Sequence, residues 1–202
     1  MVETYIQPRS ALAPFLTKGR YGSLDGKAGL SILEVKEFAL ASVTTFKNQK
    51  TGLKKAIKQF FEIDLPTRSK VATKDGISFV GIAPGQWLAF AETQYSHSFI
   101  GQLESCVGTL GAVVDQSDAR AIVELSGPKV RSALSKGISI DMDERIFGKG
   151  DAATTMAAQL WITLWQTDEA PVFRIAIFRA YGSSLVDWIS TSAAEFGYEI
   201  IG

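Results

Sequence analysis

The order of apolar segments repeats in the two halves of this 202-residue chain, and that order limits the folds it can adopt. Each half predicts strand, helix, two strands and helix. The helices are predicted over 51–61 and 96–107 in the first half, and over 127–136 and 184–196 in the second. Helices that alternate with strand pairs in this way pack on one face of a mostly antiparallel sheet. The sequence therefore predicts an α+β fold.

The predicted strands and breaks define an arm followed by one domain. Residues 1–28 contain scattered prolines and glycines and predict an irregular N-terminal arm. Residues 29–202 predict a single compact domain, in which half-modules over about 29–110 and 111–202 each have a ferredoxin-like βαββα order. The predicted strands are 29–35, 37–46, 76–83, 86–91, two short strands within 111–125, and then 158–166 and 172–179.

The composition is that of a globular protein without an excess of either charge. Hydrophobic residues make up 46% of the chain, and the 21 lysines and arginines equal the 21 aspartates and glutamates. Binders of nucleic acid or of membrane surfaces usually carry a basic excess, so neither partner is predicted. No apolar run approaches the roughly 20 residues of a membrane span, and residues 1–16 do not resemble a signal peptide. A reducing cytoplasm is the expected compartment, where the single cysteine, Cys106, is predicted to be buried and inert.

The residue types that usually build active sites are too few, or wrongly placed, for a site in this chain. His97 and Cys106 are the only histidine and the only cysteine, whereas zinc and iron sites use several such ligands. No Gly-x-Ser-x-Gly element presents a nucleophilic serine, and the segment 148–153 resembles a dinucleotide fingerprint without following an apolar strand. The acidic segment 141–144 lacks the spacing of a calcium loop. The sequence predicts no catalytic residue, no cofactor-binding residue and no metal site.

Tryptophans give the first candidates for a partner interface. Alternate residues of the predicted strand over 160–165 point to opposite faces, which places Trp161 and Trp165 on one face and three aliphatic residues on the other. A strand that is apolar on both faces must be covered on both, either by the chain itself or by a partner protein. Because tryptophan is enriched at interface hot spots, Trp161, Trp165 and also Trp87, just after a Pro-Gly turn, are candidate interface residues.

Lysines on the first predicted helix give a second candidate surface. On a helix that opens at Thr51, Lys54 and Lys58 form one stripe, opposite the apolar positions Leu53 and Ile57. The stripe has two interpretations: it is the solvated face of the helix, or it is a docking patch for an acidic partner or a polyanionic cofactor.

Several segments resemble known families. Within 113–136, the elements Asp115-Gln116-Ser117 and Ser126-Gly127-Pro128 flank a predicted strand, and the second opens a helix. This arrangement resembles the amino-terminal module of the glycine-cleavage T-protein, whose superfamily includes folate-dependent aminomethyltransferases. Further segments are similar, in order and spacing, to the gamma-subunit family of heterotetrameric sarcosine oxidases, and the resemblance extends from about residue 29 to residue 197. These segments are Pro84–Leu88, Gly137–Met142, Phe147–Gly150 and Arg179–Ile189.

The resemblance implies a T-protein, folate-binding type of fold and an assembly role without an active site in this chain. It implies partners, namely the larger alpha and beta subunits and a small delta subunit. The family's holoenzyme oxidises sarcosine to glycine with oxygen and passes the one-carbon unit to tetrahydrofolate. It uses FAD, FMN and NAD, and the resemblance places all these cofactors, with tetrahydrofolate, in the partner subunits.

The sequence lacks one element of the T-protein pattern, and for this reason no folate site is predicted. T-proteins carry a Gly-Gly-x-x-Asp-Asp element that places an acidic residue at folate, whereas this chain has the short turn Gln166–Glu169 at the expected place. Two alternatives therefore stay open beside the subunit hypothesis. The first is a stand-alone folate-binding or one-carbon-transfer module, and the second is a small self-associating protein with no link to an enzyme.

Overall fold

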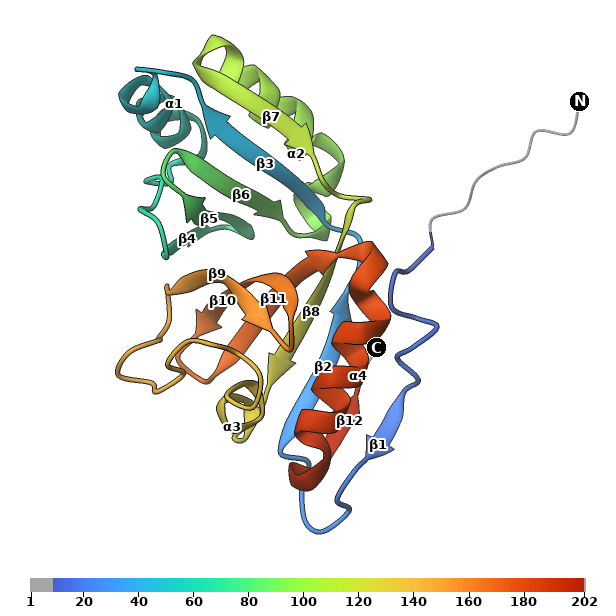
Figure 1. Ribbon diagram of the computed structural model, residues 1–202. Helices are drawn as coiled ribbons and strands as arrows, with labels where there is room; N and C mark the ends of the chain where they lie inside the picture. The colour runs from blue at the N-terminus through green and yellow to red at the C-terminus, as the bar shows by residue number, and fades with distance from the viewer. Residues whose placement is uncertain (1–8, 202) are drawn as a thin grey trace, which may run out of the picture.

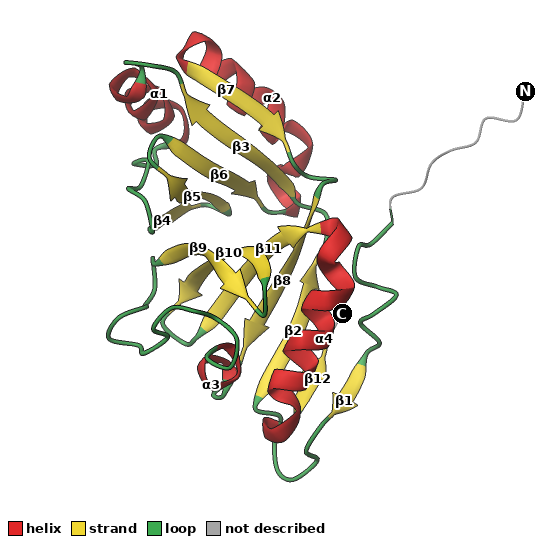
Figure 2. Cartoon of the chain, viewed as in Figure 1, coloured by secondary structure: helices red, strands yellow, loops and turns green. Residues whose placement is uncertain are grey.

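Two β-sheets, one of five strands and one of seven, pack against each other and carry helices on their outer sides (Figure 1). The computed structural model describes residues 9–201. Figure 2 shows the five-stranded sheet above the seven-stranded sheet, with strands in yellow inside and helices in red outside. This arrangement confirms the predicted α+β class.

The five-stranded sheet is a ferredoxin-like unit with one added edge strand. Its strand order is β4-β5-β6-β3-β7, and every neighbouring pair is antiparallel. Both helices of the unit bury their apolar stripes against one face of the sheet. The elements are β3 (Ala39–Thr45), α1 (Lys50–Phe61), β4 (Val71–Lys74), β5 (Ile77–Ala83), β6 (Gln86–Ala91), α2 (Thr93–Val107), a 3-10 turn (Gly108–Leu110) and β7 (Gly111–Asp115).

The seven-stranded sheet holds the remaining strands in the order β1-β12-β2-β8-β11-β10-β9. All of its neighbouring pairs are antiparallel except β12 and β2, which are parallel. The elements are β1 (Gly19–Tyr21), β2 (Leu30–Val35), β8 (Arg120–Ser126), α3 (Val130–Leu134), β9 (Ala152–Ala157), β10 (Leu160–Asp168), β11 (Val172–Phe178), a 3-10 turn (Arg179–Tyr181), α4 (Gly182–Ala193), a second 3-10 turn (Ala194–Phe196) and β12 (Tyr198–Ile200).

The two sheets do not divide at residue 110, where the sequence places the boundary between half-modules. Strand β2, from the first half, lies between β8 and β12, and β7, from the second half, is the edge strand beside β3. The predicted strands over 29–35 and 37–46 both form, but in different sheets, because the chain crosses between the sheets at Lys36–Phe38. Alternation of apolar residues identifies each strand, whereas strand pairing depends on contacts that are distant in sequence.

Four strands that the pattern did not predict, β1, β4, β9 and β12, lie at or next to sheet edges. They are short or rich in polar residues, so their alternation is weak. The N-terminal arm is therefore less irregular than predicted, since β1 pairs with β12. Leu12 is also fully buried against α4, where an added Cβ on Gly182 would lie 2.6 Å from the leucine side chain.

Three apolar clusters fill the layers of the molecule. One lies between the five-stranded sheet and helices α1 and α2, and a second between the seven-stranded sheet and helices α3 and α4. The third joins the inner faces of the two sheets. Its buried members are Leu40, Val80, Leu88, Phe90, Ile122, Ala152, Trp165 and Ala176.

The only cysteine lies on α2, against the helix–sheet cluster of the five-stranded sheet. Partial burial of Cys106 raises the pKa of its thiol above the usual range, so less thiolate is present at neutral pH. We expect the folded chain to react with a disulfide reagent about tenfold more slowly at pH 7.5 than the chain unfolded in guanidinium, with a rate that rises with pH. Equal rates for the folded and unfolded chains would contradict a protected thiol.

Candidate functional site

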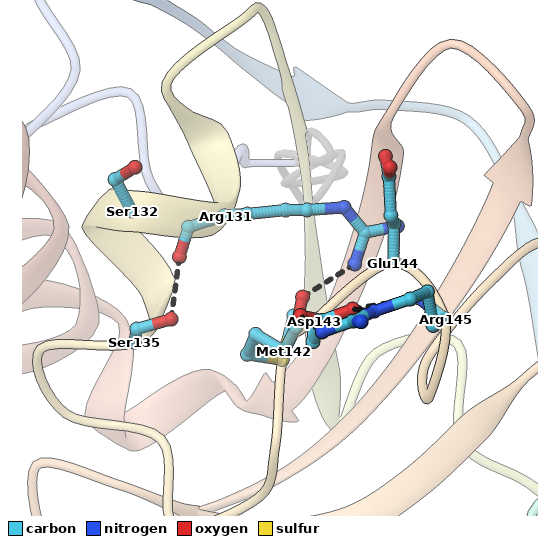
Figure 3. A pocket seen from close by; sticks show the side chains of 7 residues that line it. All are labelled: Arg131, Ser132, Ser135, Met142, Asp143, Glu144 and Arg145. Atoms are coloured by element: carbon cyan, nitrogen blue, oxygen red, sulfur yellow. Dashed lines mark hydrogen bonds and ion pairs between the residues drawn. The ribbon is translucent and has the colours of Figure 1, made fainter.

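The first of two open depressions lies beside α3 and the loop that follows it (Figure 3). It has a volume of about 570 Å³. Its lining is polar, with two arginines and two carboxylates, which are residue types that could bind a charged ligand. The lining residues are Arg131, Ser132, Ser135, Met142, Asp143, Glu144 and Arg145.

The side chain of Arg131 makes three hydrogen bonds to acceptors within the chain, two of them to the loop. Its Nη1 donates to the carbonyl oxygens of Met142 and Phe147, at 2.7 and 2.8 Å. Its Nη2 donates to Oε1 of Gln166 at 2.7 Å, and the guanidinium lies 5.0 Å from the centroid of the Phe173 ring. A guanidinium that already satisfies three acceptors within the chain is a structural group before it is an anion receptor.

The remaining charges of this depression pair with each other at the surface. Both Arg145 Nε and Nη2 donate to the carboxylate of Asp143 at 2.8 Å. This pairing holds the pKa of Asp143 far below its usual range, so the carboxylate stays ionised and cannot act as an acid near neutral pH. No group of three or more His, Cys, Asp or Glu side chains that could hold a metal ion occurs within residues 9–201.

The second depression, of about 470 Å³, lies where the two sheets meet. Arg174 on β11 donates to Glu124 on β8 at 2.8 Å and to Glu92, just before α2, at 3.1 Å. Its guanidinium also lies 5.0 Å from the centroid of the Phe90 ring. Phe90 and Glu92 belong to the unit of the five-stranded sheet, and Arg174 belongs to the seven-stranded sheet. The contacts of Arg174 therefore link the two sheets.

Two of the three candidate tryptophans are buried inside the chain. Trp87 is 2% exposed within the helix–sheet cluster, and its indole N–H donates to the carbonyl of Pro66 at 2.9 Å. Trp165 is 0% exposed and lies between the sheets, 6.3 Å from the Phe90 ring. Neither side chain reaches the surface, which corrects the interface prediction for these two residues. At Trp165, the second face of the strand is covered by the chain's own five-stranded sheet.

Trp161 is 63% exposed and lies on the same face of β10 as Trp165, as predicted. It is opposite Met156 on β9. Since Ile162 pairs with Ile177, Trp161 is also beside Phe178 on β11, and Phe178 pairs with Arg120 on β8. These side chains form a row across four strands, at the end of the face that the five-stranded sheet covers elsewhere. We call it the aromatic row: Met156, Trp161, Phe178 and Arg120.

The sequence predicts an interface role for one member of the aromatic row, Trp161, and for none of the others. Phe178 ends a strand whose other apolar residues are mostly buried, and it is 44% exposed. Arg120 begins β8 directly after a turn, so its position on the sheet depends on pairing with β11. Alternation along 172–178 could have placed Phe178 on the face opposite Ile177, but not beside Trp161.

The lysine stripe of α1 is a surface feature. Lys58 is exposed and pairs with Asp64 at 2.7 Å, while Lys54 is half-buried. On the other face of the helix, Leu53 and Ile57 are buried against the sheet as predicted. Docking of an acidic partner on Lys54 and Lys58 stays a prediction.

The turn that replaces the acidic element of T-proteins presents no enclosed carboxylate. Gln166 is buried, with its amide N–H₂ donating to the carbonyl of Asp168 at 2.6 Å and its oxygen occupied by Arg131. The carboxylates of Asp168 and Glu169 are exposed at the tip of the β10–β11 hairpin. These residues do not form a pocket with an acid at its base.

A family model described as the sarcosine oxidase, gamma subunit family matches residues 48–195. The chain belongs to this family. It is 29% identical over 126 residues to the sarcosine oxidase subunit gamma of Corynebacterium sp. strain P-1, a match that covers 62% of this chain and 61% of the relative. It is 29% identical over 124 residues to the subunit gamma of an Arthrobacter species, covering 60% and 59%. The matched region thus spans about three fifths of the length of these family members.

Two solved structures confirm the T-protein type of fold. A chain of the heterotetrameric sarcosine oxidase from Corynebacterium sp. U-96, in complex with pyrrole 2-carboxylate, superposes with a TM-score of 0.79 at 24% identity, covering 94% of this chain and 96% of that chain. The glycine cleavage system aminomethyltransferase T from Bartonella henselae gives a TM-score of 0.63 at 13% identity, covering 87% of this chain and 48% of that chain. The family resemblance noted in the sequence is also confirmed.

None of the helices that the structure describes is long and apolar enough to cross a bilayer.

Proposed function

We propose that this chain is the gamma subunit of a heterotetrameric sarcosine oxidase, with a structural role in assembling the complex. The complex would demethylate sarcosine oxidatively to glycine and transfer the one-carbon unit to tetrahydrofolate. The observation that carries this proposal is the match of the gamma-subunit family model to residues 48–195. The likeness of nearly the whole chain to a chain of a heterotetrameric sarcosine oxidase supports it.

The proposed partners are alpha, beta and delta subunits, and the proposed compartment is the cytoplasm. We propose that FAD, FMN, NAD and tetrahydrofolate are all held by the partner subunits. The fixed arginines support this division, because Arg131 and Arg174 already bind acceptors within the chain and are poorly placed to receive a phosphate or a carboxylate of a ligand. In this proposal, the chain contributes a surface built on two packed sheets and no reacting group.

Co-expression of the tagged chain with the alpha, beta and delta subunits of the same source tests the proposal. After affinity capture, size-exclusion chromatography and a flavin absorbance scan should show one large yellow complex that oxidises sarcosine, while the chain alone should be colourless and inactive. If the chain instead elutes alone in both preparations and binds tetrahydrofolate in a calorimetric titration, the stand-alone folate module replaces the subunit.

A further inference from the structure

The aromatic row is an exposed apolar strip next to a buried one. The same face of the seven-stranded sheet supplies Ile122, Trp165 and Ala176 to the cluster between the sheets. The described residues leave one end of this face uncovered, and there Trp161 is 63% and Phe178 44% exposed. Two large aromatic side chains at adjacent exposed positions of a sheet make the kind of apolar patch that marks a protein–protein interface.

Arg120 gives this patch a chemical preference. Its guanidinium lies 4.2 Å from the centroid of the Phe178 ring, and its Nε is buried without a hydrogen-bond partner in the described part of the chain. Burial lowers the pKa of Arg120, and no carboxylate of the described residues counters that effect. The Nε of Arg20 is also buried without a partner, but the Nη2 of Arg20 donates to the carbonyl of Ser23. The partly buried guanidiniums of Arg131, Arg174 and Arg179 have acceptors as well. A partly buried guanidinium whose Nε lacks an acceptor favours a partner that supplies a carboxylate.

We propose that the aromatic row is a docking surface for another subunit of the complex, which places a carboxylate on the Arg120 guanidinium and an apolar side chain on the two aromatic rings. This inference rests on the proposed function and specifies which face of the chain the assembly uses. The occupant is a protein segment with an Asp or Glu next to an apolar residue.

A second copy of this chain fits the row less well than a different subunit. In a two-fold dimer, the same surface patch of both copies forms the interface, so the aromatic row of one copy would face the aromatic row of the other. The row contains a cation and no carboxylate, so self-pairing brings two guanidiniums together without an acceptor. A partner that presents an acid supplies the missing charge.

Matched variants of the full chain, co-expressed with the other subunits, test the docking surface. Trp161→Ser removes the exposed ring and Arg120→Gln the charge, and their controls are Leu24→Ser, at an exposed loop position, and Arg145→Gln, at an exposed arginine. We expect each row variant to weaken incorporation into the complex about tenfold without lowering the melting temperature of the isolated chain, and the controls to assemble like the wild type. Arg120→Lys should restore part of the incorporation.

Footprinting of the wild-type chain gives a second measurement that needs no variant. Met156 and Trp161 are both readily oxidised side chains, so hydroxyl-radical labelling of the free chain and of the complex, read by mass spectrometry, reports their exposure. Protection of both in the complex supports the docking surface, and unchanged labelling overturns it.

The outcomes separate this inference from the function on which it rests. If the wild type and the row variants enter the complex equally, the docking surface is wrong and the subunit function stands. If the wild type does not enter, both are wrong. If the isolated wild type forms a dimer that the row variants abolish, the occupant is a second copy and the inference is overturned.

Discussion

Replacing Trp165 by alanine should lower the free energy of unfolding by about 4 kcal/mol, because it opens a cavity at the centre of the contact between the two sheets. The Trp165 side chain is 0% exposed and packs with Phe90 from the other sheet. The cluster it belongs to has only eight buried members, so few neighbours can move to refill the space. Equilibrium unfolding in urea, followed by far-ultraviolet circular dichroism, measures the change.

Trp161 provides the matched control, since it lies four residues earlier on the same face of the same strand. Its side chain is mostly exposed, so Trp161→Ala in the isolated chain should cost no more than about 0.5 kcal/mol. A third variant removes the Trp165 indole N–H, which makes no hydrogen bond within the described residues. Trp165→Phe should therefore lose volume only and cost about 1–2 kcal/mol. Equal losses for Trp165→Ala and Trp161→Ala would show that the sheets do not depend on Trp165.

This tryptophan pair shows what could be predicted from the sequence. Alternation placed Trp161 and Trp165 on one face of a strand, and the register confirms it. Alternation does not say how far along that face the second sheet extends, and this alone decides that Trp165 is buried and Trp161 exposed. The prediction of Trp87 as an interface residue is wrong because alternation also does not show which elements cover a face. Its burial depends on α1 and α2 covering the other face of a different sheet.

The helices and the α+β class followed from periodicity, whereas the strand exchange did not. All four predicted helices form, the third shortened to Val130–Leu134. The insertion of β2 between β8 and β12 depends on a parallel pairing between residues about 170 positions apart, such as Leu30 and Tyr198. A local pattern contains no information on such a pair. The proposed docking surface also depends on strand pairing between distant residues, because the pairing of β8 with β11 places Arg120 beside Phe178.

Replacing Arg131 by methionine should cost about 3 kcal/mol of unfolding free energy. Methionine keeps much of the side-chain volume but none of the donors, so the carbonyl oxygens of Met142 and Phe147 and the amide oxygen of Gln166 each lose a charge-assisted hydrogen bond. Each such bond contributes on the order of 1 kcal/mol at a partly buried site. Urea unfolding should show a lower midpoint, and limited proteolysis should cleave first within 140–151.

Arg145 is the control for this loss, because it is an arginine that lines the same depression but donates only to the carboxylate of Asp143 at the surface. Its pair with Asp143 is formed by two residues of one exposed turn, and exposed ion pairs contribute little, so Arg145→Met should change stability by less than about 0.5 kcal/mol. Comparing the stability changes of the two variants shows whether an arginine in this depression stabilises the fold or only forms an ion pair at the surface. If Arg131→Met is as mild as Arg145→Met, the loop is held by its own turns. A large loss of unfolding free energy for Arg131→Met alone shows that the guanidinium links α3, the loop and β10, and is not available to a ligand.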